Sequence, residues 1–161
     1  MIDDESLRQF EPGTEVVIGI DEAGRGPVLG PMVYAAFMCP LSVIPELKSD
    51  YGFGDSKQLT DARRRLLFEK IKSHPKKMAY LTRVLGPEEL SREMLRRHRV
   101  NLNTLSHEAA ATLVKQVIAR GDVKVKKLEV DTVGDPHRYC KYLESLFSDV
   151  TVSVEPIADS T

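Results

Sequence analysis

The sequence has few cysteines, no long hydrophobic run and no excess of charge of either sign. Its two cysteines, Cys39 and Cys140, lie far apart and form neither a metal-binding nor a disulfide pattern, which is typical of a reducing compartment. The longest apolar run, residues 32–39, is far shorter than the roughly 20 residues of a membrane-spanning helix. The acidic first ten residues lack the apolar core of a signal peptide. We therefore expect a cytosolic protein with no membrane partner.

The charge balance excludes a protein that binds polyanions through a generally basic surface. The 161 residues include 23 Lys and Arg against 24 Asp and Glu, for a net charge of −1. Three local basic runs remain, at residues 63–65, 96–99 and 124–127, and their simplest interpretation is a solvated helix face or loop. With 42% hydrophobic and 29% charged residues, the composition is that of one globular domain, which excludes extensive disorder.

The hydrophobic pattern predicts five strands and four helices, with no internal repeat. Strands are expected at residues 16–20, 32–39, 79–85, 128–130 and 150–154. Helices are expected at residues 61–73, 87–97, 104–120 and 136–147. Residues 1–14 are predicted to be a mobile lead-in, and Pro40 and Pro45 to bracket a turn. The order predicts an antiparallel meander of the first three strands followed by a parallel βαβ unit, hence a mixed α/β sheet flanked by helices.

Three carboxylates stand where predicted strands end. Asp21 and Glu22 follow the first strand and Asp131 follows the fourth, and Asp159 follows the last extended stretch as a candidate fourth member. If the first and fourth strands are neighbours, Asp21 and Asp131 point to the same place. Carboxylates in close quarters need a cation to stay ionised, and oxygen ligands without His or Cys favour Mg²⁺ or Mn²⁺. The alternative is that these acids cap helices or solvate loops.

A glycine-rich loop follows the first carboxylate pair. Residues 21–30 read DEAGRGPVLG, one residue too long for a dinucleotide-binding fingerprint and without the Gly-Lys-Ser/Thr ending of a P-loop. Gly24 and Gly26 allow backbone to approach a ligand closely, and Arg25 between them offers a phosphate-binding fork. The alternative is a strained surface turn with an incidental arginine.

These motifs, taken together, resemble the type 2 ribonuclease H family (ribonuclease HII). The first motif, DEAGRG followed by PVLGPMVY, is highly specific, and further matches follow it in the family's order. They are Asp55-Ser56-Lys57, Asn101-Leu102-Asn103-Thr104-Leu105-Ser106-His107 and Val130-Asp131-Thr132-Val133-Gly134. The first and last motifs are closer to the catalytic subunit of the eukaryotic enzymes than to the bacterial forms. The resemblance runs from about Val16 to the end of the chain.

The resemblance implies a role for each matching position. Asp21, Glu22 and Asp131 match the metal-binding carboxylates, and Asp159 falls where the family places its fourth catalytic acid. The Gly24-Arg25-Gly26 segment matches the loop that senses the ribose 2′-hydroxyl. Lys57 and Asn101 match positions near the scissile and flanking phosphates. His107 is expected to be a structural side chain and not a proton shuttle. Asn103 or Thr104 is expected to cap its helix, and Asn101 is a further capping candidate.

The family resemblance also implies a fold, an activity and partners. The expected fold is a ribonuclease-H-like mixed sheet. The expected activity is cleavage, with two Mg²⁺ or Mn²⁺ ions, of the RNA strand of RNA–DNA hybrids and of single ribonucleotides in duplex DNA. The expected products carry a 5′-phosphate, the partners are two accessory subunits of a heterotrimer, and the location is the nucleus. Because the sequence stops at Thr161, it is expected to lack the family's C-terminal region. A truncated form that binds hybrids or subunits without cleaving is the alternative.

Overall fold

The fold is built on one five-stranded mixed sheet. The computed structural model describes residues 10–26, 30–53, 58–120 and 122–155. The strands are β1 (Glu15–Ala23), β2 (Met32–Pro40), β3 (Ala79–Leu85), β4 (Lys124–Asp131) and β5 (Thr151–Glu155). They lie in the order β3-β2-β1-β4-β5. The β1–β2 and β2–β3 pairs are antiparallel, whereas β1–β4 and β4–β5 are parallel. The predicted meander and parallel βαβ unit are both confirmed.

The helices agree with the prediction except between β2 and the first predicted helix, and except that α3 ends at Met94 and not near residue 97. They are α1 (Ile44–Ser49), α2 (Asp61–Ser73), α3 (Pro87–Met94), α4 (Leu102–Arg120) and α5 (Pro136–Leu146). A 3₁₀ turn (Leu41–Val43) lies between Pro40 and Pro45 as predicted, but it leads into α1, a helix that the sequence did not predict. Pro45 occupies the first turn of α1, where its backbone nitrogen needs no hydrogen-bond partner.

Two strands are longer than their apolar runs indicated. β1 continues through its acidic residues to Ala23, because its backbone keeps pairing with β2 up to Val33. β4 begins at Lys124, so the basic run at residues 124–127 belongs to a strand and not to a helix face or loop. In that run the apolar Val125 is buried while its lysine neighbours face outward. Tertiary pairing thus extends both strands into polar sequence.

Part of the predicted mobile lead-in is ordered, because Phe10 is buried in the core.

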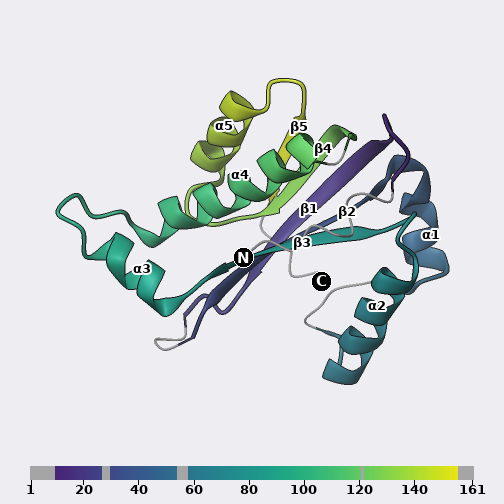
Figure 1. Ribbon diagram of the computed structural model, residues 1–161, viewed down its shortest axis with the longest axis horizontal. Coiled ribbons are helices and arrows are strands. Elements are labelled where there is room, and N and C mark those ends of the chain that lie inside the picture. The colour runs from purple at the N-terminus through teal and green to yellow at the C-terminus, as the bar shows by residue number, and fades with distance from the viewer. Residues whose placement is uncertain (1–9, 27–29, 54–57, 121, 156–161) are drawn as a thin grey trace.

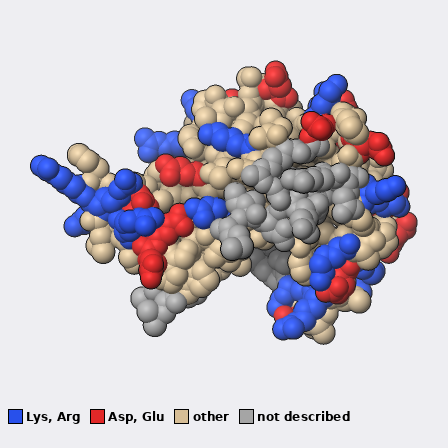
Figure 2. All heavy atoms as spheres, in the orientation of Figure 1, with Lys and Arg blue, Asp and Glu red and all other residues tan. Residues whose placement is uncertain are grey.

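The elements form a sheet with helices on both sides and one projecting segment. In Figure 1, α4 and α5 lie together on one side of the sheet, whereas α1 and α2 lie at its other end. Helix α3 and the turn after it extend to the left, away from the sheet. Lys and Arg side chains gather on this projection, as the blue spheres in Figure 2 show. None of the helices that the structure describes is long and apolar enough to cross a membrane.

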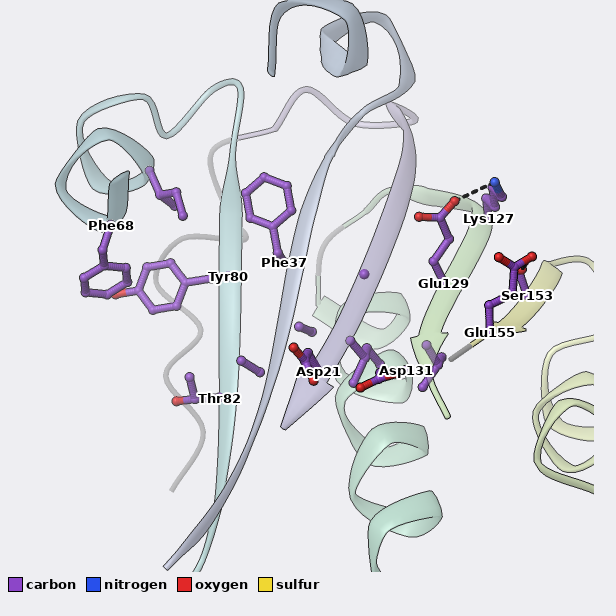
Figure 3. A pocket seen from close by; sticks show the side chains of 16 residues that line it. Asp21, Phe37, Phe68, Tyr80, Thr82, Lys127, Glu129, Asp131, Ser153 and Glu155 are labelled. Atoms are coloured by element: carbon purple, nitrogen blue, oxygen red, sulfur yellow. Dashed lines mark hydrogen bonds and ion pairs between the residues drawn. The ribbon is translucent and has the colours of Figure 1, made fainter. Parts of the chain in front are cut away.

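The face of the sheet turned away from α4 carries an open pocket of about 690 Å³. Figure 3 shows an aromatic group at one end, with Phe68 of α2 beside Tyr80 of β3, and the Asp21 and Asp131 carboxylates at the other. The Phe68 and Tyr80 rings meet edge to face, with centroids 5.1 Å apart. This packing attaches α2 to the edge of the sheet.

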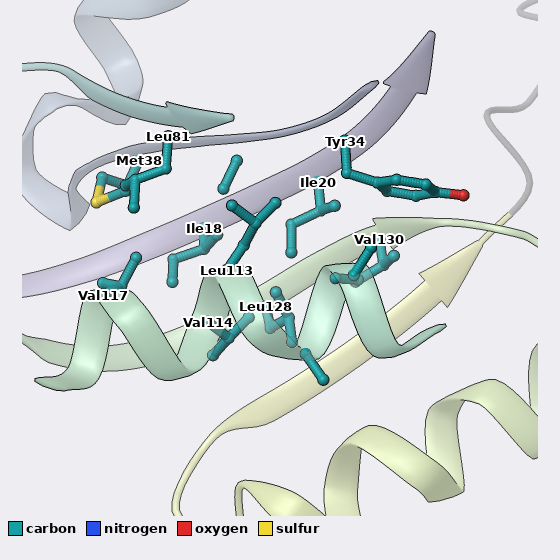
Figure 4. Close-up of a cluster of buried hydrophobic side chains, with 14 of the residues drawn as sticks. Ile18, Ile20, Tyr34, Met38, Leu81, Leu113, Val114, Val117, Leu128 and Val130 are labelled. Atoms are coloured by element: carbon teal, nitrogen blue, oxygen red, sulfur yellow. The ribbon is translucent and has the colours of Figure 1, made fainter. Parts of the chain in front are cut away.

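The opposite face of the sheet carries the hydrophobic core, covered by α4 (Figure 4). Leu113, Val114 and Val117 of α4 are fully buried against Ile18 of β1 and Leu128 of β4. Burying each such side chain stabilises the fold by about 1.5–3 kcal/mol relative to exposure. Because the same core contains Ile18 and Ile20 of β1 and Leu128 and Val130 of β4, it holds together the two strands that carry the carboxylates.

Candidate active site

The carboxylates of Asp21, Glu22 and Asp131 form one cluster. One oxygen of each lies within 4.8 Å of the others. The cluster exists because β1 and β4 are parallel neighbours, paired up to Ile20 and Val130, so that the next residue of each strand arrives at the same place. The expectation that Asp21 and Asp131 meet is therefore confirmed.

Strand alternation places these acids on different faces of the sheet edge. Successive residues of a strand point to opposite faces. Ile20 and Val130 face the core, so Asp21 and Asp131 both face the open pocket, where Figure 3 shows their side chains next to each other. Glu22 points to the opposite face, which α4 covers (the helix side), and its carboxylate reaches the cluster around the end of β1. The three carboxylates therefore approach one point from two sides.

Backbone N–H groups hold the two aspartates in place. Asp21 accepts a hydrogen bond from the N–H of Glu22 at 2.7 Å, and Asp131 accepts one from the N–H of Thr132 at 2.8 Å. Each of these hydrogen bonds fixes the direction in which its carboxylate points. The same arrangement at two adjacent strand ends gives the site two similarly oriented acceptors.

The electrostatics of the cluster affect Glu22, because the pKa of its carboxyl group is raised above the ordinary value. Partial burial is the main cause, and the negative charges of Asp21 and Asp131 add to it, while Arg25 acts in the opposite direction. Like charges in close quarters cannot all ionise without cost unless a cation is present. In the metal-free protein the cluster is therefore under mutual repulsion that a bound cation would relieve.

The chemistry of the donors fits a hard divalent cation. All three groups supply carboxylate oxygens, and no His or Cys of the described residues joins them. Such a donor set suits Mg²⁺ or Mn²⁺ better than Zn²⁺. The predicted fourth acid, Asp159, and the predicted phosphate contact, Lys57, lie outside the described residues.

The glycine loop begins directly after the cluster, and its first glycine is required by sterics. Gly24 has φ +80°, and a Cβ atom there would come within 2.4 Å of the carbonyl oxygen of Pro31. Any other residue would therefore force the two arms of the loop apart. Gly26 has φ +126° with open space around it, which leaves its backbone accessible.

Arg25 connects this loop to the start of α4. Its guanidinium donates one hydrogen bond to the hydroxyl of Ser106 at 2.9 Å and another to the side-chain oxygen of Asn103. Ser106 is fully buried, and its hydroxyl donates to the carbonyl of Leu102 at 2.9 Å. The arginine is thus held by a fork of two acceptors one helical turn apart, and because both acceptors are neutral its positive charge is kept.

The first turn of α4 corrects the residue that was favoured as its cap. Asn101, and not Asn103 or Thr104, caps the helix, because its side-chain oxygen accepts from the N–H of Thr104 at 2.8 Å. Asn103 instead holds Arg25 and also abuts Gly134, where a Cβ would lie 2.7 Å from its amide nitrogen. Asn103 thereby touches both the loop after β1 and the loop after β4.

His107 is a structural side chain, as expected. Its Nε2 lies 2.9 Å from the carbonyl oxygen of Val133, and its ring stacks on Tyr139 of α5 with centroids 3.8 Å apart. Burial raises the pKa of the Tyr139 hydroxyl well above its ordinary range. These contacts attach α4 and α5 to the loop that follows Asp131.

Ser106 is a site residue that sequence reasoning did not identify. It stands three positions after Asn103 on a helix rich in Leu and Ala, so both side chains lie on one face of α4. That spacing between two polar residues was the available signal. Its partner Arg25, however, lies about eighty residues away in the sequence, and only the packing of α4 on β1 brings the two together.

The sheet consists of a three-stranded meander continued by two parallel strands, and carboxylates lie at the ends of β1 and β4. This combination defines an α/β protein of the ribonuclease-H-like class. The solved structure of ribonuclease H2 from Pyrococcus horikoshii has this fold. It superposes with a TM-score of 0.72 and 32% sequence identity, covering 90% of this chain and 64% of its own. The family model for ribonuclease HII matches residues 18–161. The chain therefore belongs to the ribonuclease HII family.

Curated relatives agree with this assignment. The chain is 46% identical to a ribonuclease H2 subunit of Caenorhabditis elegans, over 94% of this chain and 51% of the relative. It is 42% identical to the corresponding ribonuclease H2 subunit of Homo sapiens, over 89% of this chain and 47% of the relative. The chain thus spans about half the length of the curated relatives that it matches.

Proposed function

We propose that the protein is a metal-dependent endoribonuclease that cleaves the RNA strand of RNA–DNA hybrids and single ribonucleotides embedded in duplex DNA. The observation that carries this proposal is the cluster of Asp21, Glu22 and Asp131 beside the Gly24–Gly26 loop. Membership of the ribonuclease HII family and the similarity to ribonuclease H2 subunits support it. The cut breaks the bond between phosphorus and the 3′-oxygen, which leaves a 5′-phosphate and a 3′-hydroxyl.

In this proposal the carboxylates are the cation ligands. Asp21 and Asp131 face the pocket side, and Glu22 completes the set from the helix side. Two Mg²⁺ or Mn²⁺ ions, when bound, would supply the chemistry of two-metal nucleases, activating water and stabilising the leaving oxygen. The hydrogen bonds from Glu22 and Thr132 to the aspartates keep those ligands oriented before a cation arrives. Asp159 is proposed as the fourth acid.

The glycine loop is proposed to select ribose. A 2′-hydroxyl both donates and accepts hydrogen bonds, and it is the group that distinguishes RNA from DNA at the cut. The close approach between Gly24 and Pro31 sets the path of the loop, and the open backbone at Gly26 leaves a peptide group available to such a hydroxyl. Arg25 fixes the loop against α4 and directs its charge toward a phosphate. Lys57 and Asn101 are proposed to lie near the scissile and flanking phosphates, although the side-chain oxygen of Asn101 already caps α4.

The partners proposed for the protein follow from its relatives. Each of these relatives is by its name one subunit of an assembly, and we propose two accessory subunits of a heterotrimer and a nuclear location for this protein. Co-purification with the accessory subunits of the same organism would test this part independently of cleavage.

A nuclease assay tests the proposed activity. The substrates are a duplex with one embedded ribonucleotide, an RNA–DNA hybrid and an all-DNA duplex of the same sequence, each with Mg²⁺, Mn²⁺ or EDTA. We expect cleavage of the first two only, with either cation, and 5′-phosphate products. Binding of the first duplex without cleavage under every metal condition would overturn the enzymatic proposal and leave a binding protein.

A further inference from the structure

The structure contains a basic projection that the proposed site does not use. We define the basic projection as residues 92–99, the last turn of α3 and the turn that follows it. All residues from 94 to 99 are exposed, including Leu95 at 78%. Figure 1 shows this segment extending away from the sheet, and Figure 2 shows Lys and Arg side chains gathered on it. No residue of α3 is buried, so the fold does not need this segment for its core.

The charge of the projection is only partly neutralised. Four arginines and one glutamate lie within it. Glu93 pairs with both Arg92 and Arg96. Arg97 and Arg99 make no ion pair with any residue that the structure describes, and both are exposed. Two guanidinium groups thus face solvent at the outer end of a protein whose net charge is −1.

The projection lies next to the proposed site along the chain. Arg99 is four residues from Asn103, which holds Arg25 of the glycine loop. Four residues of extended chain span at most about 14 Å. Duplex DNA rises about 3.4 Å per base pair, so this distance corresponds to about four base pairs. A duplex placed over the glycine loop would therefore come within reach of the projection.

We infer that the basic projection contacts the sugar–phosphate backbone of duplex nucleic acid a few base pairs from the cut, through Arg97 and Arg99. This inference rests on the proposed function for the placement of the duplex. The guanidinium group suits phosphate because it presents a planar fork of donors. Backbone contacts of this kind carry no sequence information, and they add affinity and fix the register of the duplex.

Two double variants test the inference. In R97Q/R99Q the two charges at the outer end of the projection are removed. In the control K124Q/K126Q two positive charges are removed at the beginning of β4, about 23 Å along the strand from Asp131. Both changes lower the net charge by two, so an effect of overall charge would be equal in both. The variant R97K/R99K keeps the charge and serves as rescue.

The readout is the salt dependence of binding to a duplex of about 30 base pairs with one ribonucleotide, measured by fluorescence anisotropy in EDTA. Each lost phosphate contact lowers the slope of log K against log salt by about 0.9. R97Q/R99Q should therefore lower the slope by about 2 and weaken binding at least roughly ten-fold near 0.1 M salt. R97K/R99K should restore most of the slope. The K124Q/K126Q control should match the wild type.

Cleavage kinetics separate the inference from the proposed function. With Mg²⁺, R97Q/R99Q should raise KM on the long duplex much more than on a duplex with three base pairs on each side of the ribonucleotide. If R97Q/R99Q and K124Q/K126Q have the same slope and affinity, or the wild type binds no duplex, the inference is overturned. If the wild type binds but never cleaves, the proposed activity fails while the slope difference still supports the contact.

Discussion

Asp21 and Asp131 show how a strand position gives a side chain its function. Both follow a buried residue of adjacent parallel strands, so they face the same pocket and converge. The alternation of residues 19–22 in β1 separates Asp21 from Glu22 across the sheet edge. The acid types were visible in the sequence, whereas the face that each acid takes was not, because it depends on how far β1 continues and on which face α4 covers.

Asp131→Asn tests the cluster directly. We expect this variant to lose nearly all cleavage, because a ligand of the proposed cations loses its charge. Its fold should persist, and the metal-free protein should melt at the same or a higher temperature, since one of three mutually repelling charges is gone. Cleavage assays and thermal melts in EDTA provide the measurement. Wild-type cleavage by Asp131→Asn would contradict the metal-ligand assignment.

Arg25 makes a second residue-level prediction. Arg25→Ala removes both the charge and the fork to Ser106 and Asn103, and we expect hybrid affinity to fall about 10- to 100-fold, or about 1.5–3 kcal/mol. Arg25→Lys keeps the charge, but one ammonium group does not reproduce the fork, so its loss should be intermediate. Arg65→Ala on α2, an exposed arginine paired with Asp61, is the matched control. Unchanged affinity in Arg25→Ala would show that the loop does not bind nucleic acid.

The elements that were predicted correctly are those whose ends carry local signals. Thr60 caps α2 by accepting from the N–H of Arg63, and Asp135 and Pro136 begin α5. The elements that were missed or shortened depended on distant partners. Residues 124–127 form a strand because they pair with β1, and residues 44–49 are helical although two prolines suggested only a turn.

Asp135→Ala makes an element-level prediction. The Asp135 carboxylate accepts hydrogen bonds from the N–H groups of His137 and Arg138, at 2.9 and 3.3 Å. Losing a cap of this kind costs about 0.5–2 kcal/mol. Urea denaturation should show that loss in the midpoint with an unchanged m-value. Asp135→Ser retains a capping oxygen and should recover most of the stability; equal destabilisation by both variants would argue that the cap contributes nothing.

At the scale of the whole molecule, one core couples the site to stability. α4 shares one core with β1 and β4, and its first turn holds the glycine loop. Ligand binding at the strand ends therefore acts on the elements that also form the core. A cation bound only by the folded chain must stabilise all of them together.

Mg²⁺ or Mn²⁺ should therefore raise the melting temperature. At a concentration about 100 times its Kd, a cation adds about 2.7 kcal/mol, which is roughly 5–11 °C for a domain of this size. Differential scanning fluorimetry with increasing MgCl₂ or MnCl₂ measures the shift, with NaCl at equal ionic strength as control. Asp131→Asn should show a much smaller shift. An equal shift in NaCl would place the effect outside the cluster.

The sequence by itself determined the kinds of element, the mixed sheet, the acids at strand ends and the use of glycine at position 24. These follow from local properties: apolar periodicity, capping residues and backbone sterics. Only the tertiary structure decided that Glu22 reaches the cluster from the helix side and that Asn103 holds Arg25. Those choices depend on contacts between residues up to about a hundred positions apart. Their energies come from packing that no local pattern contains.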